Sequence, residues 1–377
     1  VGGWVGVGMG RGGGMLGVVL RGAEVVVLGE PTAVLTPQEI EEFFNIVESL
    51  KASGRGIVFI THKLTEALKV ADRISVLRRG KTVGEADPAE IDEIGLAELM
   101  VGRPVQLVVD KAPSQPGEPI LSVDQIHAVD SSGRTLVDHV SFDVHAGEIV
   151  GVAGVQGNGQ TELVEALTGL RDVITGSIHL GSEDITHATP RDVHRAGVAH
   201  IPEDRQRAGL VGDFSVAENM VLTRYHDDGF STGIKMDWPK ARAVAADLVE
   251  QYDVRTPSIQ TAAGNLSGGN QQKVIVAREL SRDLELVIAS QPTRGVDVGS
   301  IEYIHSQVVK ARDEGAAVLV VSTELDEVMA LSDRVIVMYR GRIVANLRRD
   351  ETEHNDIGLY MAGAKEQPVK TDAETTS

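Results

Sequence analysis

Cysteine is absent from the 377-residue chain, which excludes disulfide bonds and thiolate metal sites and fits a reducing compartment. Aromatic residues make up only 3% of the chain, too few to favour a surface that stacks nucleic-acid bases. Positive charge is also scarce: the formal net charge is -19, whereas a nucleic-acid partner requires clustered Lys and Arg. We therefore expect no nucleic-acid partner.

A long apolar run is missing as well. Residues 1–20 are the only segment that resembles one, but nine of the first 17 residues are glycine and Arg11 interrupts them. A spanning helix needs about 20 mainly apolar residues, and a signal peptide needs a compact apolar core. The sequence thus predicts membrane contact only through partners. Its length predicts two domains, because single cores stop growing at roughly 250 to 300 residues.

The chain contains a long internal repeat. The triplet at 30–32 (Glu-Pro-Thr) matches 291–293 (Gln-Pro-Thr), and the Asp-Arg pair at 72–73 matches 333–334, a shift of 261 residues from 72 to 333. Each copy has apolar runs that predict strands, followed by helical stretches. The strands are expected at 25–28, 57–60 and 74–77, and again at 287–289, 318–321 and 335–338. Alternating strands and helices predict a largely parallel α/β sheet in each copy.

The repeat also predicts domain boundaries. Residues 1–102 match only the C-terminal part of the later copy, since nothing before Val1 corresponds to residues 119–265. Residues 103–118 contain several prolines with Ser and Gly and are expected to form a linker. Residues 119–363 form the complete second unit, and the polar residues 364–377 are expected to be a disordered tail.

A glycine-rich loop follows the apolar strand predicted at 149–153 and precedes a helix predicted at 162–170. Its sequence, Gly154-Val155-Gln156-Gly157-Asn158-Gly159-Gln160-Thr161, departs from the P-loop pattern because Gln160 stands where lysine is expected. Backbone N–H groups can still hold phosphates, and Thr161 can reach Mg²⁺. The loop is therefore expected to bind nucleotide and to hydrolyse it poorly. A glycine turn without a ligand is the alternative.

A second glycine motif, Leu-Ser-Gly-Gly-Asn-Gln-Gln-Lys at 266–273, precedes an apolar strand expected at 285–291. A serine and two glycines at a helix start leave backbone N–H groups unpaired, and the helix dipole favours an anion there. The motif thus predicts a phosphate contact, although a serine N-cap followed by chance glycines would look the same.

The two copies differ where their strands end. Glu30 in the first copy is replaced by the neutral Gln291 in the second, and His62 is replaced by Thr323. Gln291 cannot act as a base, so only the first copy is expected to carry a catalytic carboxylate. A solvated strand end and a structural histidine are the alternative readings of Glu30 and His62.

These motifs together resemble the fused ATP-binding subunits of bacterial sugar and nucleoside importers of the ATP-binding cassette (ABC) type, the class related to the ribose transporter's ATPase. The resemblance covers nearly the whole chain. It rests on the glycine loop at 157–160, the runs Ile-Pro-Glu-Asp-Arg at 201–205 and Asn-Leu-Ser-Gly-Gly-Asn-Gln-Gln-Lys at 265–273, and the runs at 291–297 and 322–327.

The resemblance implies tandem P-loop NTPase cassettes, the first partial and the second complete, with two ATPs held between one cassette's P-loop and the other's signature motif. Glu30 and His62 would then be catalytic, and their site would be completed by Ser267, Gly268, Gly269 and Gln271. A degenerate site would bind ATP through Gly154, Gly157, Asn158, Gly159, Gln160, Thr161 and Glu162, with Thr161 on Mg²⁺. Glu203 lies near the position of the glutamine that contacts Mg²⁺ in the family.

The family resemblance also implies the function: an ATP-hydrolysing subunit that drives import of simple sugars or nucleosides. It would dock on the cytoplasmic face of the membrane against two permease subunits and serve an extracytoplasmic solute-binding protein indirectly. An N-terminally truncated, non-catalytic nucleotide-binding fragment is the alternative, because one P-loop is missing and the other lacks its lysine. The N-terminal glycines at 10–17 argue in the same direction, since glycine costs about 1 kcal/mol relative to alanine within a helix.

Overall fold

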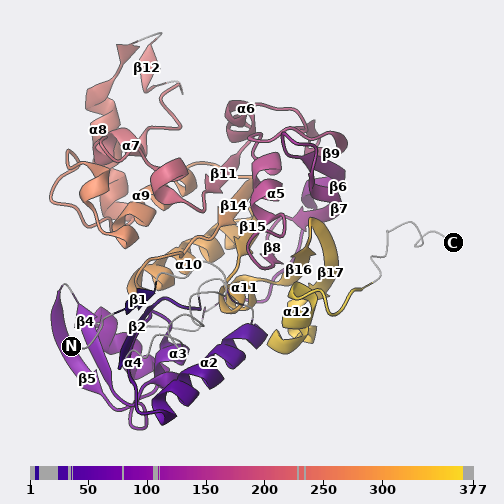
Figure 1. The fold of residues 1–377 in the computed structure, drawn as a ribbon. Coiled ribbons are helices and arrows are strands. Elements are labelled where there is room, and N and C mark those ends of the chain that lie inside the picture. Colours follow the sequence, from indigo (N-terminus) through magenta and orange to yellow (C-terminus); the bar gives the residue numbers. More distant parts are fainter. Residues whose placement is uncertain are drawn as a thin grey trace. The chain divides into compact units, whose positions relative to one another are not determined.

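The computed structural model describes residues 5–7, 24–32, 35, 37–78, 80–104, 109, 111–226, 229–232 and 235–367. The chain divides into two units, residues 1–107 with 297–299 and residues 108–296 with 300–377, which are described separately (Figure 1). The glycine-rich residues 10–17 and most of the predicted tail lie outside the described residues.

The first unit contains a three-stranded parallel sheet and a hairpin. The sheet has the order β1 (Val5–Val7), β2 (Val25–Gly29) and β3 (Gly56–Ile60), and the hairpin joins β4 (Ile74–Arg78) to β5 (Lys81–Ala86). The helices are α2 (Pro37–Ala52), α3 (Leu64–Val70) and α4 (Glu93–Val101). Val26 and Leu28 of β2 pack with buried Phe43 and Val47 of α2. One alternating face of β2 is therefore buried by this helix.

A six-stranded sheet forms the centre of the second unit. Its order is β11 (Val198–Ile201), β14 (Leu286–Ser290), β15 (Ala317–Ser322), β8 (Ile149–Ala153), β16 (Arg334–Tyr339) and β17 (Arg342–Arg348). All neighbouring pairs are parallel except β16 with β17. Every residue of β8, β14 and β15 is buried. Burial on both faces explains why these strands are continuous apolar runs.

Two layers cover this sheet. On one face lie α9 (Gly268–Leu280) and α10 (Val298–Asp313); on the other lie α5 (Gln160–Leu167) and a second sheet. The second sheet is antiparallel, in the order β10 (Glu183–Asp184), β9 (Thr175–Leu180), β6 (Pro119–Val129) and β7 (Thr135–His145). The sequence did not predict this antiparallel sheet.

The remaining elements of the second unit surround these layers. They comprise α6 (Pro190–Arg195), a π-helical turn (Arg205–Gly209), α7 (Val216–Met220), β12 (Ser231–Thr232), β13 (Lys235–Met236), α8 (Trp238–Gln251), α11 (Leu325–Leu331) and α12 (His354–Met361). Figure 1 shows α7 and α8 gathered with α9 at one end of the unit.

The predicted strands are confirmed to within two residues at each end, including the one expected at 285–291, which is β14. The helix expected at 162–170 begins earlier, at Gln160, and ends at Leu167 as α5. The helices expected after the strands at 25–28 and 287–289 are α2 and α10. Within the described residues, no helix is long and apolar enough to cross a membrane.

The backbone of the two units repeats with the offset found in the sequence. Val25 pairs with Gly56 in the first unit, as Leu286 pairs with Ala317 in the second. The hairpins β4–β5 and β16–β17 carry a register shift at equivalent places, between Val76 and Leu77 and between Val337 and Met338. The pairs of elements α2 and α10, α3 and α11, and α4 and α12 begin 261 residues apart, as in α2 at 37 and α10 at 298.

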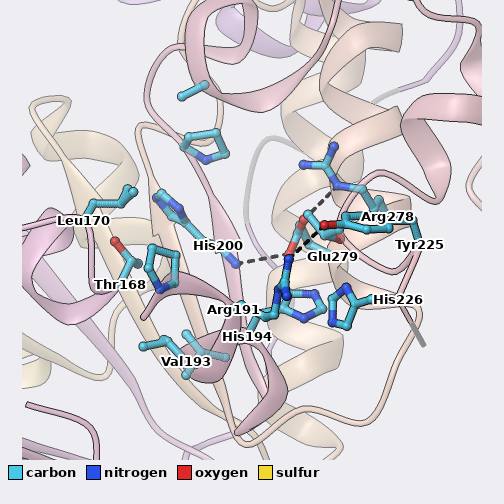
Figure 2. Close-up of a pocket in the computed structure, with 15 residues that line it drawn as sticks. Thr168, Leu170, Arg191, Val193, His194, His200, Tyr225, His226, Arg278 and Glu279 are labelled. Carbon is cyan, nitrogen blue, oxygen red and sulfur yellow. Dashed lines mark hydrogen bonds and ion pairs between the residues drawn. The ribbon is translucent and has the colours of Figure 1, made fainter. Parts of the chain in front are cut away.

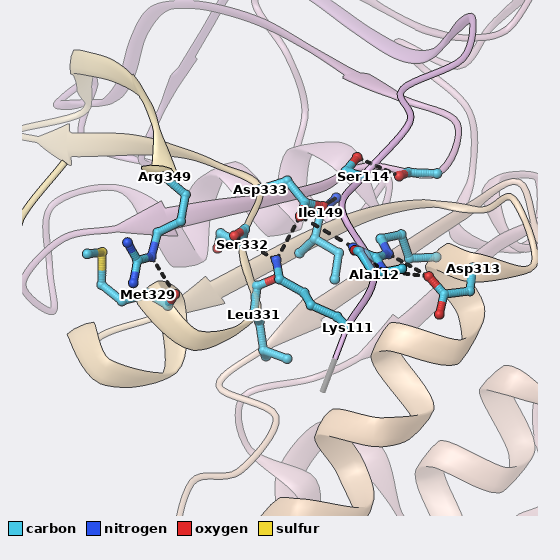
Figure 3. A network of polar contacts seen from close by, with 12 residues as sticks. Lys111, Ala112, Ser114, Ile149, Asp313, Met329, Leu331, Ser332, Asp333 and Arg349 are labelled. Atoms are coloured by element: carbon cyan, nitrogen blue, oxygen red, sulfur yellow. Dashed lines mark hydrogen bonds and ion pairs between the residues drawn. The ribbon is translucent and has the colours of Figure 1, made fainter. Parts of the chain in front are cut away.

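Part of the predicted linker is anchored to the second unit (Figure 3). Lys111 Nζ donates hydrogen bonds to the carbonyl oxygens of Leu331 (2.7 Å) and Ser332 (2.8 Å) and to Asp333 Oδ1 (2.7 Å). Ser114 Oγ donates to the carbonyl oxygen of Gly147 at 2.9 Å. Proline, serine and glycine composition carries no signal for such tertiary contacts, so sequence reasoning did not anticipate them.

Candidate functional site

The glycine loop of the second unit connects β8 to α5 in a conformation that needs its glycines. Gly157 and Gly159 have φ angles of 89° and 103°. A Cβ on Gly159 would lie 2.7 Å from the carbonyl oxygen of Leu136, and a Cβ on Gly154 would lie 2.8 Å from that of Met338. Neighbouring backbone therefore fills the space that side chains would need.

The start of α5 is open to an anion. Gly159 is its N-cap and offers no side-chain hydrogen bond, and the N–H groups of the first turn, from Gln160 to Glu162, have no acceptor within the helix. The positive end of the helix dipole lies at the same place. Gln160 is 5% exposed, and within the described part of the chain its Nε2 has no hydrogen-bond partner. These unused donors fit a phosphate group.

Thr161 begins a chain of polar contacts at the mouth of this loop. Its Oγ1 donates to Glu203 Oε2 at 3.2 Å, and Arg294 Nη1 lies 2.5 Å from Glu203 Oε1. Ser290, which ends β14, is buried. Glu203 is thus the carboxylate that contacts the predicted Mg²⁺ ligand Thr161.

The motif at 266–273 opens α9 as the sequence predicted. Ser267 is the N-cap, but its side chain makes no cap hydrogen bond; instead its Oγ accepts from Asn270 Nδ2 at 2.8 Å. The N–H groups of Gly268 and Gly269 are left at the positive end of the helix. Gln271 is 4% exposed, and its Nε2 donates to the carbonyl oxygens of Ala263 (3.2 Å) and Gly264 (3.3 Å). The amide of Gln271 is therefore occupied within the second unit.

Arg205 connects this motif to the loop after β14. Its guanidinium donates to the carbonyl oxygens of Arg294 (2.6 Å) and Gly295 (3.2 Å) and to Gln271 Oε1 (3.4 Å). A Cβ on Gly268 would lie 2.8 Å from Arg205 Nη2. Burial lowers the pKa of Arg205 below its ordinary value, although the group stays charged at neutral pH. Sequence reasoning missed this role, because Arg205 and the two segments that it contacts meet only in the tertiary structure.

The strand ends carry contrasting pairs at equivalent positions of the two units. In the first unit, His62 Nδ1 lies 2.9 Å from Glu30 Oε2, and both side chains are partly exposed. In the second unit, Thr323 Oγ1 donates to Gln291 Oε1 at 3.3 Å. Glu30 and Gln291 share a φ of 47°, which is uncommon for residues other than glycine. The structure therefore brings Glu30 and His62 together as an acid–imidazole pair.

A buried carboxylate supports the strand end of the second unit. Glu327 accepts a hydrogen bond from Thr293 Oγ1 at 2.5 Å, and its Oε1 lies 3.0 Å from His305 Nε2. Burial disfavours the ionised form, but hydrogen bonds from His305, Thr293 and Ser322 outweigh it and lower the pKa of Glu327. Glu66 of the first unit is buried in the same way and accepts from Thr32 Oγ1 at 2.5 Å.

A cavity of about 300 Å³ lies beside Pro202, the residue that precedes Glu203 (Figure 2). Its lining includes Pro202, Arg191, Tyr225, His194, His200, His226 and the Arg278–Glu279 ion pair. Arg191 Nη2 donates to Tyr225 Oη at 2.9 Å. Burial lowers the pKa of His200, so its ring is neutral at pH 7.

Comparison with known proteins identifies the family. A family model described as ABC transporter matches residues 137–294. The chain is 47% identical over 349 residues to the nucleoside import ATP-binding protein NupA of Lactococcus lactis, covering 93% of this chain and 69% of that protein. The chain belongs to the ABC transporter family. It is an ATP-binding subunit of the import type and a transport ATPase, which acts together with membrane permease partners.

Two further relatives have related names. The guanosine import ATP-binding protein NupO of Bacillus subtilis is 45% identical, with 96% of this chain and 71% of that protein covered. The glucose import ATP-binding protein TsgD13 of Haloferax volcanii is 43% identical, with 96% of this chain and 66% of that protein covered.

Solved structures confirm the α/β ABC cassette fold. A nucleotide-free ATP-binding cassette from an ABC transporter aligns with a TM-score of 0.55 and 24% identity, covering 64% of this chain and 96% of that one. A dimeric cassette in a post-hydrolysis state, bound to ADP and Pi, aligns with a TM-score of 0.53 and 19% identity, covering 61% of this chain and 99% of that one.

Proposed function

We propose that this subunit couples ATP hydrolysis to the import of a nucleoside or a simple sugar. The names of its relatives support these solutes, since they specify nucleoside, guanosine and glucose import. The solute itself would meet the permease and an extracytoplasmic solute-binding protein, whereas this chain would meet ATP.

The proposal includes two cassettes in one chain. Residues 1–102 would be the C-terminal part of a first cassette, 103–118 a linker, 119–363 a complete second cassette and 364–377 a tail. The equivalent strand registers and the shared φ of Glu30 and Gln291 support this division. So do the buried Thr–Glu pairs, Thr32 with Glu66 and Thr293 with Glu327.

The contrast between the Glu30–His62 and Gln291–Thr323 pairs carries the functional proposal. A carboxylate beside an imidazole can orient and polarise a water molecule, whereas a glutamine amide cannot accept its proton. Glu30 would therefore be the catalytic base, with His62 holding its carboxylate. By family resemblance, Ser267, Gly268 and Gly269 would complete this site from the second cassette, and Gln271 would position them.

The glycine loop of the second cassette would bind ATP without hydrolysing it efficiently. Gly154, Gly157, Asn158 and Gly159 shape a cradle whose backbone donors contact phosphate, and Gln160 contributes an uncharged amide where a lysine would add charge. Mg²⁺, when bound, would neutralise phosphate charge. Thr161 and Glu203 are the residues placed to hold it, and Arg294 would balance the charge of Glu203.

The chain would dock on the cytoplasmic face of the membrane against two permease subunits. Pro202 lines the cavity and directly precedes Glu203 in the chain, so a permease segment seated in the cavity would act on Glu203 through this neighbouring residue. Arg191 and Tyr225 at the cavity wall could accept polar groups of that segment.

A second candidate function is a non-catalytic nucleotide-binding module. Gln160 and Gln291 favour it, because both remove groups on which phosphoryl transfer depends. Hydrolysis by the purified chain distinguishes the two. Turnover that is abolished by Gln160→Ala would refute the non-catalytic reading.

The proposal itself is tested in the assembled transporter by Glu30→Gln. Loss of a general base should lower ATP turnover by about 100-fold or more. Gln291→Ala at the equivalent position is the matched control and should leave turnover within about threefold. Unchanged turnover in Glu30→Gln would remove Glu30 from the catalytic role.

A further inference from the structure

One histidine of β6 faces an Asp-His pair of β7 on the antiparallel sheet. Ile126 pairs with Val140 and Ala128 pairs with Val137, so the single residue His127 lies opposite two residues, Asp138 and His139. This arrangement is a β-bulge, and His139 adopts a φ of 51° within it. In a regular strand, adjacent side chains point to opposite faces; the bulge lets both side chains approach His127.

The three side chains lie within coordination range of one another. His127 Nδ1 is 3.6 Å from Asp138 Oδ1, and His139 Nδ1 is 2.7 Å from the same oxygen. One possible ligand atom from each of the three residues lies within 4.8 Å of the other two. Among the described residues, this is the only group of three His, Cys, Asp or Glu side chains that meets this condition. His127 Nδ1 is buried and makes no hydrogen bond to any described residue.

The orientation of the Asp138 carboxylate suits a cation. Arg342 Nε donates to Asp138 Oδ2 at 2.6 Å, which leaves Oδ1 directed at the two histidines. A carboxylate held in this way presents one fixed oxygen.

We propose that His127, Asp138 and His139 form a site for a divalent transition metal of the Zn²⁺ class. Two imidazole nitrogens and one carboxylate oxygen are ligands that Zn²⁺ accepts, with water at the fourth position. Tetrahedral bonds of about 2.0 to 2.1 Å place ligand atoms about 3.4 Å apart. His139, whose side chain is 59% exposed, is free to make the small rotation required. Binding replaces the hydrogen bond between His139 and Asp138, so the metal competes with a proton.

The site adjoins the nucleotide loop through two backbone hydrogen bonds. Asp138 N donates to the carbonyl oxygen of Gly341 at 2.8 Å, and Gly341 N donates to that of Asn158 at 2.9 Å. A metal bound to both β6 and β7 would stabilise the part of β7 that is hydrogen-bonded, through Gly341, to the glycine loop. Metal occupancy should therefore raise the melting temperature of the chain.

Zn²⁺ titration of the metal-free chain against a chromophoric chelator tests the site. The chain has eleven histidines, so variants must separate this site from weaker ones. We expect one Zn²⁺ per chain to bind most tightly, and His127→Ala and His139→Ala each to weaken that step at least about tenfold. His187→Ala, which removes an exposed histidine elsewhere, should leave it unchanged.

Co²⁺ provides an independent readout, since tetrahedral coordination should give visible absorption that both cluster variants lose. If His127→Ala does not fold, His139→Ala suffices, because an exposed side chain can be removed with little effect on the core. The proposal is overturned if tight Zn²⁺ binding is absent, or if it survives in folded His139→Ala with unchanged affinity.

Discussion

Replacing His305 with phenylalanine should destabilise the second unit through the buried Glu327. Phe44 occupies the equivalent position of the first unit and is buried there, so a phenylalanine side chain fits at this position of the fold. In the second unit the change removes the imidazole that lies 3.0 Å from Glu327 Oε1. The remaining hydrogen bonds come from Thr293 and Ser322.

The expected loss follows from the charge on Glu327. A hydrogen bond to a charged group contributes about 1.5 to 3 kcal/mol, and the carboxylate keeps other donors, so we expect about 2 kcal/mol at pH 7. The folded pKa of Glu327 is lowered from 4.5, so its stabilising contribution is present above that pH and is lost as pH falls through the folded pKa. The difference between parent and variant should therefore shrink toward acid pH.

Urea unfolding, followed by circular dichroism from pH 7 down to about pH 3, below the usual pKa of a glutamate, measures this difference. His305→Gln is the matched control, because its amide can still donate to Glu327, and it should lose less than about 1 kcal/mol. A His305→Phe variant as stable as the parent at pH 7, or a loss independent of pH, would refute the reasoning.

Three further perturbations have definite outcomes. Gly159→Ala should weaken binding of a fluorescent ATP analogue at least about tenfold, whereas Gly157→Ala, whose Cβ would meet no atom within 4 Å, should weaken it less. Arg205→Met removes the hydrogen bonds to the loop after β14, so amide exchange at 293–296 should accelerate. Burial lowers the pKa of Lys111 below 10.5, so parent stability should rise with pH between the lowered pKa and 10.5, and Lys111→Met should lack this rise in urea titrations.

The strands and the glycine loops could be predicted because their signals are local. Apolar runs such as 149–153 are buried on both faces, and glycines 157 and 159 adopt conformations that other residues avoid. The repeat added information that one copy could not supply, because it aligned Glu30 with Gln291.

Contacts between distant segments could not be predicted. Arg205 donates hydrogen bonds to the loop at 294–295 and to Gln271, and Lys111 donates to the end of α11. The sequence around either residue looks the same as the sequence around an exposed arginine or lysine. The bulge that gathers His127, Asp138 and His139 depends on the pairing register of two strands, which alternation alone does not fix.

The fate of the nucleotide bound to the second cassette tests the central claim most directly. A photoreactive ATP analogue can be cross-linked in the assembled transporter after a single turnover, and the nucleotide attached to residues 154–162 can be identified. The account predicts triphosphate there, because Gln160 and Gln291 disfavour hydrolysis, while diphosphate forms at the site of Glu30. Diphosphate attached to residues 154–162, formed equally in Glu30→Gln, would contradict it.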